Sequence, residues 1–388
     1  MNQIIIKGPQ IYTETGIIQN ASLSIQEDKI YSIDANNSSL VTYNFPASYH
    51  LIPGFIDLQL HGVKACDIMD ATVNSYQTIT NNLPAEGTTS FLACTMTELD
   101  AGICAAMTSL NQFTKTNYQG AEIVGIHLEG PFIAAKYVGA QRPNAVIAPN
   151  IDLFKQWQHL SGNLIKIVTL AIEQEHGLEL TDYLTQQGVL TSFGHSEANY
   201  DQAIAAIKKG CSTATHLFNA MRGLHHREPN AVTAMLLADS VTPQIIVDGV
   251  HLHPAIVKLI YQLKGKDKLV LVTDAMSGKA CSDGEYELGG QTVIVQQGQA
   301  RLVDGTLAGS VLTMLDAVLN TMKFADIPFA DALYMATQVP AKMINIFDRK
   351  GSIKVGKDAD LVVLDEHYQV VMTFCRGIVA YERGVMPI

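Results

Sequence analysis

Eight short apolar segments, several of them separated by helix-like patterns, constrain the fold of this 388-residue chain more than any other feature. The segments are GFIDLQLHG, TTSFLACT, EIVGIHLEG, LIKIVTLAIE, GVLTSFGHS, TATHLFNA, PQIIVDGV and KLVLVTDAM. Residues 199–210, NYDQAIAAIKKG, show helical spacing with a closing glycine. Strands that alternate with helices form parallel sheets, and eight such units predict an α/β fold of the (β/α)8 TIM-like barrel type. Other α/β sheets remain compatible with this pattern.

The two ends of the chain have a different character. Residues 1–53 and 350–388 consist of short β-like runs and turn residues, without a long helical period. Each end alone is too short to close a core. We therefore expect both ends to pair as one small β domain, and the barrel to span residues 54–349.

Composition narrows the class of partner. The formal net charge is −11 and the chain has no basic block, which argues against nucleic acid and anionic membranes as main partners. No window approaches the length of apolar sequence that spans a membrane, and the N-terminus does not read as a secretory leader. The six cysteines form no C-x-x-C pair. We expect a soluble cytoplasmic protein.

Polar side chains follow most of the predicted strands, at the barrel end where such folds carry their chemistry. These residues are Gln59, His61, Glu129, His195, His216, Asp248, His251 and Asp274. A single histidine on an apolar strand is usually a hydrogen-bonded core residue. The repetition of this pattern at five or six strand ends instead favours one shared site.

Glu129, His195 and His216 have the chemistry of a metal site. A buried carboxylate needs a partner, and one carboxylate with two imidazoles and a water is the open arrangement of a catalytic metal. Zn²⁺ matches this donor set best, while iron, manganese and cobalt remain open. Asp274 ends the last strand, where it serves either as a helix cap or, as we favour, as a general base.

Several groups point to an anionic substrate. Arg142, Arg227 and His251 are the local cations on the predicted barrel loops of an acidic chain. Such cations suit a phosphate group. Asn219 and Ala220 directly follow a strand, where their backbone N–H groups are available to the same anion.

The motifs PGFIDLQLHG, HLEGPF, FGHS, THLFNAM, HHREPN, DGVH, VTDAM and LAGS occur in this order along nearly the whole chain. Together they resemble the N-acetylglucosamine-6-phosphate deacetylases of the amidohydrolase superfamily. The resemblance implies a (β/α)8 barrel with a small β-sandwich made from both termini, usually in a homodimer. It also implies hydrolysis of the acetamide of N-acetylglucosamine 6-phosphate by a metal-activated water.

Motif by motif, the resemblance implies one divalent metal ion per subunit, held by Glu129, His195 and His216, with Asp274 as the catalytic acid and base. The implied substrate contacts are Ala140, Gln141, Asn219, Ala220, Arg227, His251, Leu307, Ala308 and Gly309. Within this family the arginine at the position of Arg227 can reach the phosphate across the dimer interface, which would make the homodimer part of the site.

Two positions depart from the family pattern. Two-metal members carry His-x-His on the first strand and single-metal members carry Gln-x-Asn, whereas this chain has Gln59-Leu60-His61. We expect one tightly bound metal, with Gln59 and His61 forming at most a weak second site or polarising the substrate carbonyl. Gln141 stands where a histidine commonly lies near that carbonyl.

Three alternatives remain. A cyclic-amide hydrolase often uses a modified lysine at the end of the fourth strand, but the only lysine of that strand, Lys166, lies at its start. A deacetylase for N-acetylgalactosamine 6-phosphate needs the same metal and phosphate contacts. A catalytically inactive binding protein of this fold would be expected to lack a ligand or the acid/base, yet all four residues are present.

Overall fold

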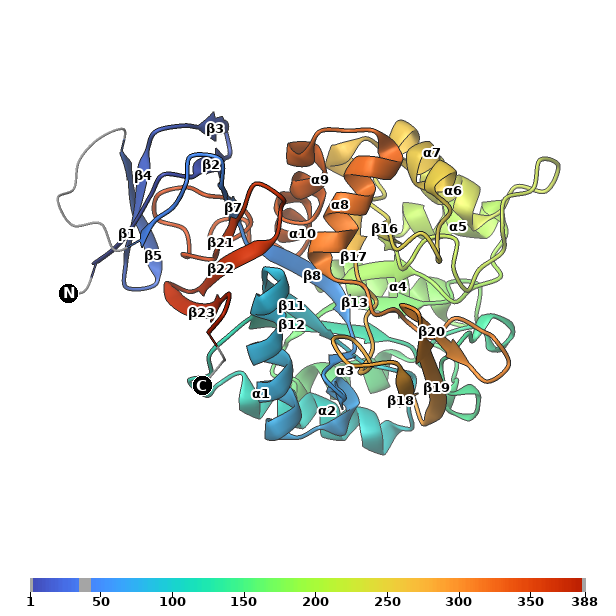
Figure 1. Ribbon diagram of the computed structural model, residues 1–388. Coiled ribbons are helices and arrows are strands. Elements are labelled where there is room, and N and C mark those ends of the chain that lie inside the picture. Colours follow the sequence, from blue (N-terminus) through green and yellow to red (C-terminus); the bar gives the residue numbers. More distant parts are fainter. Residues whose placement is uncertain (1–2, 35–42, 386–388) are drawn as a thin grey trace.

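The computed structural model describes residues 3–34 and 43–385, and within them eight parallel strands form the predicted barrel (Figure 1). These strands are β8 (Phe55–Leu60), β11 (Thr88–Cys94), β12 (Glu122–Glu129), β13 (Ile165–Leu170), β14 (Leu190–Phe193), β15 (Cys211–Ala214), β16 (Gln244–Ile246) and β17 (Val270–Val272). Seven of the predicted segments contain one of these strands and the sixth overlaps β15, so the α/β class and the barrel are confirmed. The sixth strand begins earlier than predicted, which leaves His216 in the loop that follows it.

Backbone hydrogen bonds close the ring of strands. Consecutive strands pair in parallel from β8 to β15 and again between β16 and β17. Leu217 N donates to Gln244 O at 2.9 Å, which joins the end of β15 to β16. Asp274 N donates to Gln59 O at 2.9 Å, which joins the end of β17 to β8. The C-terminal ends of all eight strands therefore meet at one rim.

Helices surround the barrel (Figure 1). They are α1 (Val73–Asn82), α2 (Asp100–Phe113), α3 (Ile151–Leu160), α4 (Gly177–Gln186), α5 (Tyr200–Lys208), α6 (Ala231–Leu237), α7 (Pro254–Lys264), α8 (Met314–Ala325), α9 (Phe329–Met335) and α10 (Gln338–Met343). Short 3₁₀ turns cover Ile68–Asp70, Leu83–Glu86, Ala135–Tyr137, Pro143–Ala145 and Lys266–Lys268. The predicted helix in 199–210 is α5, which Asn199 and Gln202 begin with a reciprocal capping box. In the described part of the chain, each helix is too short or too polar to cross a membrane.

Two further sheets form a sandwich beside the barrel, where blue N-terminal and red C-terminal segments lie together in Figure 1. One sheet contains β1 (Gln3–Lys7), β4 (Ser22–Gln26), β5 (Lys29–Asp34) and β6 (Tyr43–Asn44). The other contains β2 (Gln10–Thr13), β3 (Gly16–Ile18), β7 (His50–Pro53), β21 (Leu361–Leu364), β22 (Val370–Cys375) and β23 (Ile378–Glu382). Strand β7 pairs with both β2 and β21, so the two ends of the chain share one sheet, as predicted. Leu23, Leu51 and Phe374 belong to the apolar core of this sandwich.

A small antiparallel sheet was not predicted from the sequence. It consists of β18 (Gly284–Leu288), β19 (Gln291–Gln296) and β20 (Gln299–Leu302), between β17 and α8. Its buried side chains, Leu288, Val293 and Val295, pack with Met96 and Met276, which follow barrel strands. The sheet therefore lies against the C-terminal rim. A two-strand hairpin, β9 (Gly62–Val63) with β10 (Cys66–Asp67), follows β8 at the same rim.

An ion cluster connects the C-terminal segment to the opposite end of the barrel. Lys350 is 2% exposed, and its Nζ lies 2.8 Å from Glu122 Oε2, 3.1 Å from Asp358 Oδ2 and in contact with Asp360. Burial raises the pKa of Glu122, but Arg349 and Lys350 outweigh it and lower that pKa to about 2. Because Glu122 begins β12, the cluster lies at the N-terminal end, away from the rim that carries the polar strand ends.

Candidate active site

Three predicted metal ligands meet at the C-terminal rim. Glu129 ends β12, is 1% exposed, and its Oε1 lies 3.1 Å from the Nε2 atoms of both His195 and His216. The two Nε2 atoms are 3.0 Å apart. The structure thus brings residues from three different strand ends to one point, and these side chains form a candidate metal-binding group.

The backbone at this point adopts an uncommon conformation. His195, His216 and Asp274 follow strand ends with φ of 48°, 32° and 51°, in the left-handed region that non-glycine residues rarely occupy. Such residues persist where the surrounding structure fixes them, and they cluster at functional sites. Gly194 makes the close approach possible, because a Cβ there would lie 2.8 Å from the Thr169 side chain.

The arrangement of lone pairs fits a metal ion. The Nδ1 atom of His195 lies 2.9 Å from the carbonyl oxygen of Tyr137, which can only accept, so Nδ1 carries the proton. The Nε2 atom of the neutral ring then directs a lone pair at His216 and Glu129, and such acceptors repel one another unless a cation lies between them. Burial raises the pKa of Glu129, but the imidazoles of His195, His216 and His61 around the carboxylate outweigh it and hold that pKa well below its ordinary value.

Asp274 lies beside this group, as predicted. Its Oδ1 accepts a hydrogen bond from Gln59 Nε2 at 3.0 Å and lies 3.1 Å from His61 Nε2. Gln59 Nε2 also donates to Glu129 Oε2 at 3.0 Å. Gln59 and His61 therefore connect the two carboxylates and fix the position of Asp274 relative to the candidate metal ligands.

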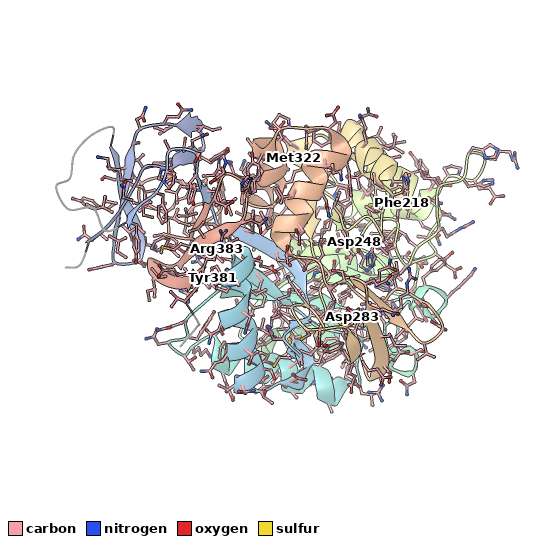
Figure 2. The ribbon with its side chains drawn as sticks, in the orientation of Figure 1. Phe218, Asp248, Asp283, Met322, Tyr381 and Arg383 are labelled. Carbon is pink, nitrogen blue, oxygen red and sulfur yellow. The ribbon has the colours of Figure 1, made fainter. Side chains whose placement is uncertain are left out.

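A cavity of about 350 Å³ opens above these residues. Of the predicted substrate contacts, Ala140, Gln141, Asn219, Ala220, His251, Leu307 and Gly309 line it. His251 is held by Asp248, labelled in Figure 2, whose Oδ2 lies 2.6 Å from its Nδ1. The Oε1 atom of Gln141 accepts from Thr97 N at 2.6 Å, which leaves the amide nitrogen of Gln141 as its hydrogen-bond donor.

Two predicted contacts lie outside the cavity lining. Ala308 is fully buried in the small apolar cluster beneath the β18–β20 sheet. Arg227 lies on the exposed loop between β15 and α6, which projects from the barrel in Figure 1, and its Nη1 contacts His226 Nε2 at 2.7 Å. Neither side chain reaches the site within its own chain.

Sequence reasoning missed two polar side chains of this rim. Cys94 ends β11 and its Sγ lies 3.4 Å from Glu129 Oε2, but in the sequence it reads as one more apolar strand residue. Lys136 lines the cavity and its Nζ pairs with Glu197 Oε2 at 3.1 Å. Its position four residues after Phe132 of the HLEGPF motif was the available signal.

Together the fold and the rim define a class: a (β/α)8 barrel with a buried carboxylate–dihistidine centre and a second carboxylate beside it, which is suited to metal-assisted hydrolysis. The chain belongs to the amidohydrolase family, whose model matches residues 50–379. This family is metal-dependent, in agreement with the donor group formed by Glu129, His195 and His216.

Individual relatives extend over nearly the whole chain. The chain is 40% identical over 384 residues to the N-acetylglucosamine-6-phosphate deacetylase of Bacillus subtilis (strain 168), with 97% of both sequences covered. It is 32% identical to the N-acetylgalactosamine-6-phosphate deacetylase of Escherichia coli O157:H7, with 97% of this chain and 99% of that one covered. A mutant N-acetyl-D-glucosamine-6-phosphate deacetylase from Mycobacterium smegmatis, solved in complex with N-acetyl-D-glucosamine-6-phosphate, is 30% identical with a TM-score of 0.92. That similarity covers 98% of this chain and 100% of the other.

Replacing His195 with alanine removes one of the three converging donors. We expect His195→Ala to weaken the tightest-bound Zn²⁺ at least about 100-fold, since even partners of a ligand contribute 10- to 100-fold. Competition with a chromogenic chelator measures this affinity. His176→Ala is the control, because His176 is an exposed histidine at the start of α4. An unchanged affinity in His195→Ala would contradict the assignment.

Proposed function

We propose that this chain hydrolyses the acetamide of N-acetylglucosamine 6-phosphate to glucosamine 6-phosphate and acetate. One observation carries the proposal: a buried carboxylate–dihistidine group and Asp274 share one cavity, in a chain 40% identical over 97% of its length to a deacetylase for this substrate. In this proposal the amide of the substrate lies at the metal-binding group. The phosphate meets the basic side chains, and the sugar lies against the polar walls of the cavity.

Glu129, His195 and His216 would hold one divalent ion, and their mixed nitrogen and oxygen donors match Zn²⁺ best. When bound, such an ion lowers the pKa of water to about 7 and polarises a carbonyl group. The three side chains determine the position of the ion, because each of them lies at or just after the end of a barrel strand.

Asp274 moves the proton. Its carboxylate takes a proton from the attacking water while the water oxygen bonds to the acetamide carbon. The carbon–nitrogen bond then breaks, and Asp274 gives the proton to the departing amine. Hydrogen bonds from Gln59 and the neighbouring His61 hold the carboxylate in one orientation for both transfers. His61 also lines the cavity, where its ring is available to the developing oxyanion.

The phosphate binds farther from the metal group. Asn219, Ala220 and His251 line the cavity, and Lys136 lies at its edge with an exposed side chain. Backbone and side-chain N–H groups together with cations are the usual ligands of a phosphate.

Acetate release from N-acetylglucosamine 6-phosphate tests the function. We expect release to stop after chelation and to return with added metal, and Asp274→Asn to lower kcat at least about 100-fold with metal content unchanged. Asp283→Asn is the control, since Asp283 is exposed beside β18 (Figure 2). If Asp274→Asn keeps more than roughly a tenth of kcat, it is not the acid/base. A wild-type chain that binds no metal and releases no acetate would instead be a binding protein.

The galacto epimer is the second candidate substrate. The 32% identity to an N-acetylgalactosamine-6-phosphate deacetylase over 97% of this chain favours it, and both epimers need the same metal and phosphate contacts. We expect kcat/KM to be greater for the gluco epimer, because the deacetylase with 40% identity is named for that substrate. The opposite ratio in parallel assays would reassign the substrate.

We also propose a homodimer in which Arg227 contacts the phosphate in the partner's site. Arg227 lies on a projecting loop outside its own cavity, which is the position that a contribution in trans requires. The basic side chains that line the cavity, Lys136 and His251, already pair with Glu197 and Asp248. An arginine from the partner would add bidentate hydrogen bonds to the phosphate.

Heterodimers test this arrangement. We expect Arg227→Ala and Asp274→Asn to be impaired as separate homodimers. Co-expressed with different tags and purified as a heterodimer, they should regain activity, because the Arg227→Ala site keeps its own Asp274 and receives Arg227 from the other chain. A monomer in sedimentation, or no gain in the heterodimer, would contradict the proposal.

The cytoplasm is the compartment that we propose. The six cysteines all lie within the described residues and are unpaired. Free thiols are typical of a reducing compartment, and a phosphorylated sugar is an intracellular kind of metabolite.

A further inference from the structure

A group of buried hydrogen bonds lies inside the barrel, beside the candidate metal-binding group. His127 Nε2 lies 2.7 Å from Thr169 Oγ1, which lies 2.6 Å from Thr215 Oγ1. Thr215 Oγ1 in turn lies 2.5 Å from Ser192 Oγ. The other ring nitrogen of His127, Nδ1, lies 2.9 Å from the carbonyl oxygen of Leu58. We call the four polar side chains the barrel network. All of them are fully buried, so a hydrogen bond lost here is not replaced by water.

The carbonyl group of Leu58 fixes the direction of every hydrogen bond in the network. A carbonyl oxygen only accepts, so Nδ1 of His127 carries a proton. A second ring proton would place a buried charge between two neutral partners, which is costly, so Nε2 accepts from the Thr169 hydroxyl. Each hydroxyl has one proton to donate. Thr169 therefore accepts from Thr215, and Thr215 accepts from Ser192.

The network connects the strands that carry the three candidate metal ligands. Its members shortly precede these ligands in the sequence: His127 is two residues before Glu129 on β12, Ser192 is three residues before His195, and Thr215 directly precedes His216. Thr169 lies on β13, which pairs with both β12 and β14. The three ligand-bearing segments are therefore tied to one another by side chains as well as by the backbone of the sheet.

The turn before His195 lies directly against this network. A Cβ at Gly194 would lie 2.8 Å from Thr169 Cγ2 and 3.0 Å from Thr215 Cβ, so the two threonines form the surface on which this glycine packs. The next residue, His195, has a φ of 48°, and His216 has a φ of 32°. Such conformations persist only where the surroundings hold them. The network supplies contacts of this kind on the interior side.

We propose that the barrel network positions Glu129, His195 and His216 for metal binding, with Thr169 and Thr215 as its central positioning residues. None of the four side chains belongs to the donor group itself. Their role is to hold the donors in one arrangement before the ion arrives, so that binding does not have to order them. The inference rests on the metal-binding group of the proposed function.

Replacing a threonine hydroxyl by a methyl group tests this role. We expect Thr169→Val and Thr215→Val to bind Zn²⁺ at least about 10-fold more weakly than the wild type in competition with a chromogenic chelator. Thr215→Ser keeps the hydroxyl and should keep the affinity. Thr191→Val is the matched control: Thr191 is a fully buried residue of β14 whose Oγ1 has no hydrogen-bond partner among the described residues.

A double variant and a milder variant complete the test. Thr169 and Thr215 share one hydrogen bond, so the affinity loss in Thr169→Val/Thr215→Val should be smaller than the product of the two single losses. Ser192→Ala removes only the last donor of the network, and we expect it to weaken Zn²⁺ binding about 5-fold. This small truncation keeps the inference testable if the valine variants do not fold.

Thermal unfolding of the metal-free chain separates positioning from a merely structural role. Affinities are measured well below the unfolding midpoint of each variant. A lowered midpoint with wild-type Zn²⁺ affinity in the valine variants, or in Ser192→Ala where these do not fold, would overturn the inference and leave the metal-binding group intact. An equal loss of affinity in Thr191→Val would also overturn it. A wild-type chain that binds no Zn²⁺ would overturn the metal-binding group and this inference together.

Discussion

Burial of the Glu129 carboxylate is the constraint on which the rest of this structure depends. A charge that is 1% exposed at a strand end costs several kcal/mol unless nearby groups compensate it. Here the compensation comes from other strand ends: His195 and His216 face Oε1, and Gln59 and Cys94 donate to Oε2. These residues lie on or just after the ends of five strands, so those strands must pair in the correct register. A slip of one residue would turn a side chain to the other face of its strand.

Buried charges are compensated differently at the two ends of the barrel. At the N-terminal end, Lys350 is surrounded by the carboxylates of Glu122, Asp358 and Asp360, so positive and negative groups are matched within the protein. At the C-terminal rim, imidazole lone pairs and the carboxylates of Glu129 and Asp274 converge without a lysine or arginine in the cluster. The first arrangement stabilises the junction with the C-terminal segment, whereas the second forms a group of donor atoms suited to a bound cation.

Much of this was predictable because parallel strands carry their C-terminal ends to a single rim. That rule alone places Glu129, His195, His216 and Asp274 together from positions spread over 146 residues, 129 to 274. The rule does not predict the conformation of the loops. It could not show that Leu307 and Gly309 line the cavity while Ala308 between them is buried, or that the loop of Arg227 projects outward. The β18–β20 sheet was missed because it lies outside the repeating strand–helix pattern. Cys94 was missed because the sequence does not distinguish a cysteine that packs in the apolar core from one that contacts the polar groups of a site.

The distribution of charge also determines how a phosphorylated substrate enters. The chain carries a net charge of −11, and the floor of the cavity holds Glu129 and Asp274. These carboxylates repel a phosphate at short range, whereas Lys136 and His251 on the cavity wall attract it. Only the uncharged acetamide end can therefore approach the floor at low cost. Orientation thus follows from the two buried carboxylates for which we propose metal binding (Glu129) and proton transfer (Asp274), so the same pair of acidic side chains also selects which end of the substrate reaches the floor.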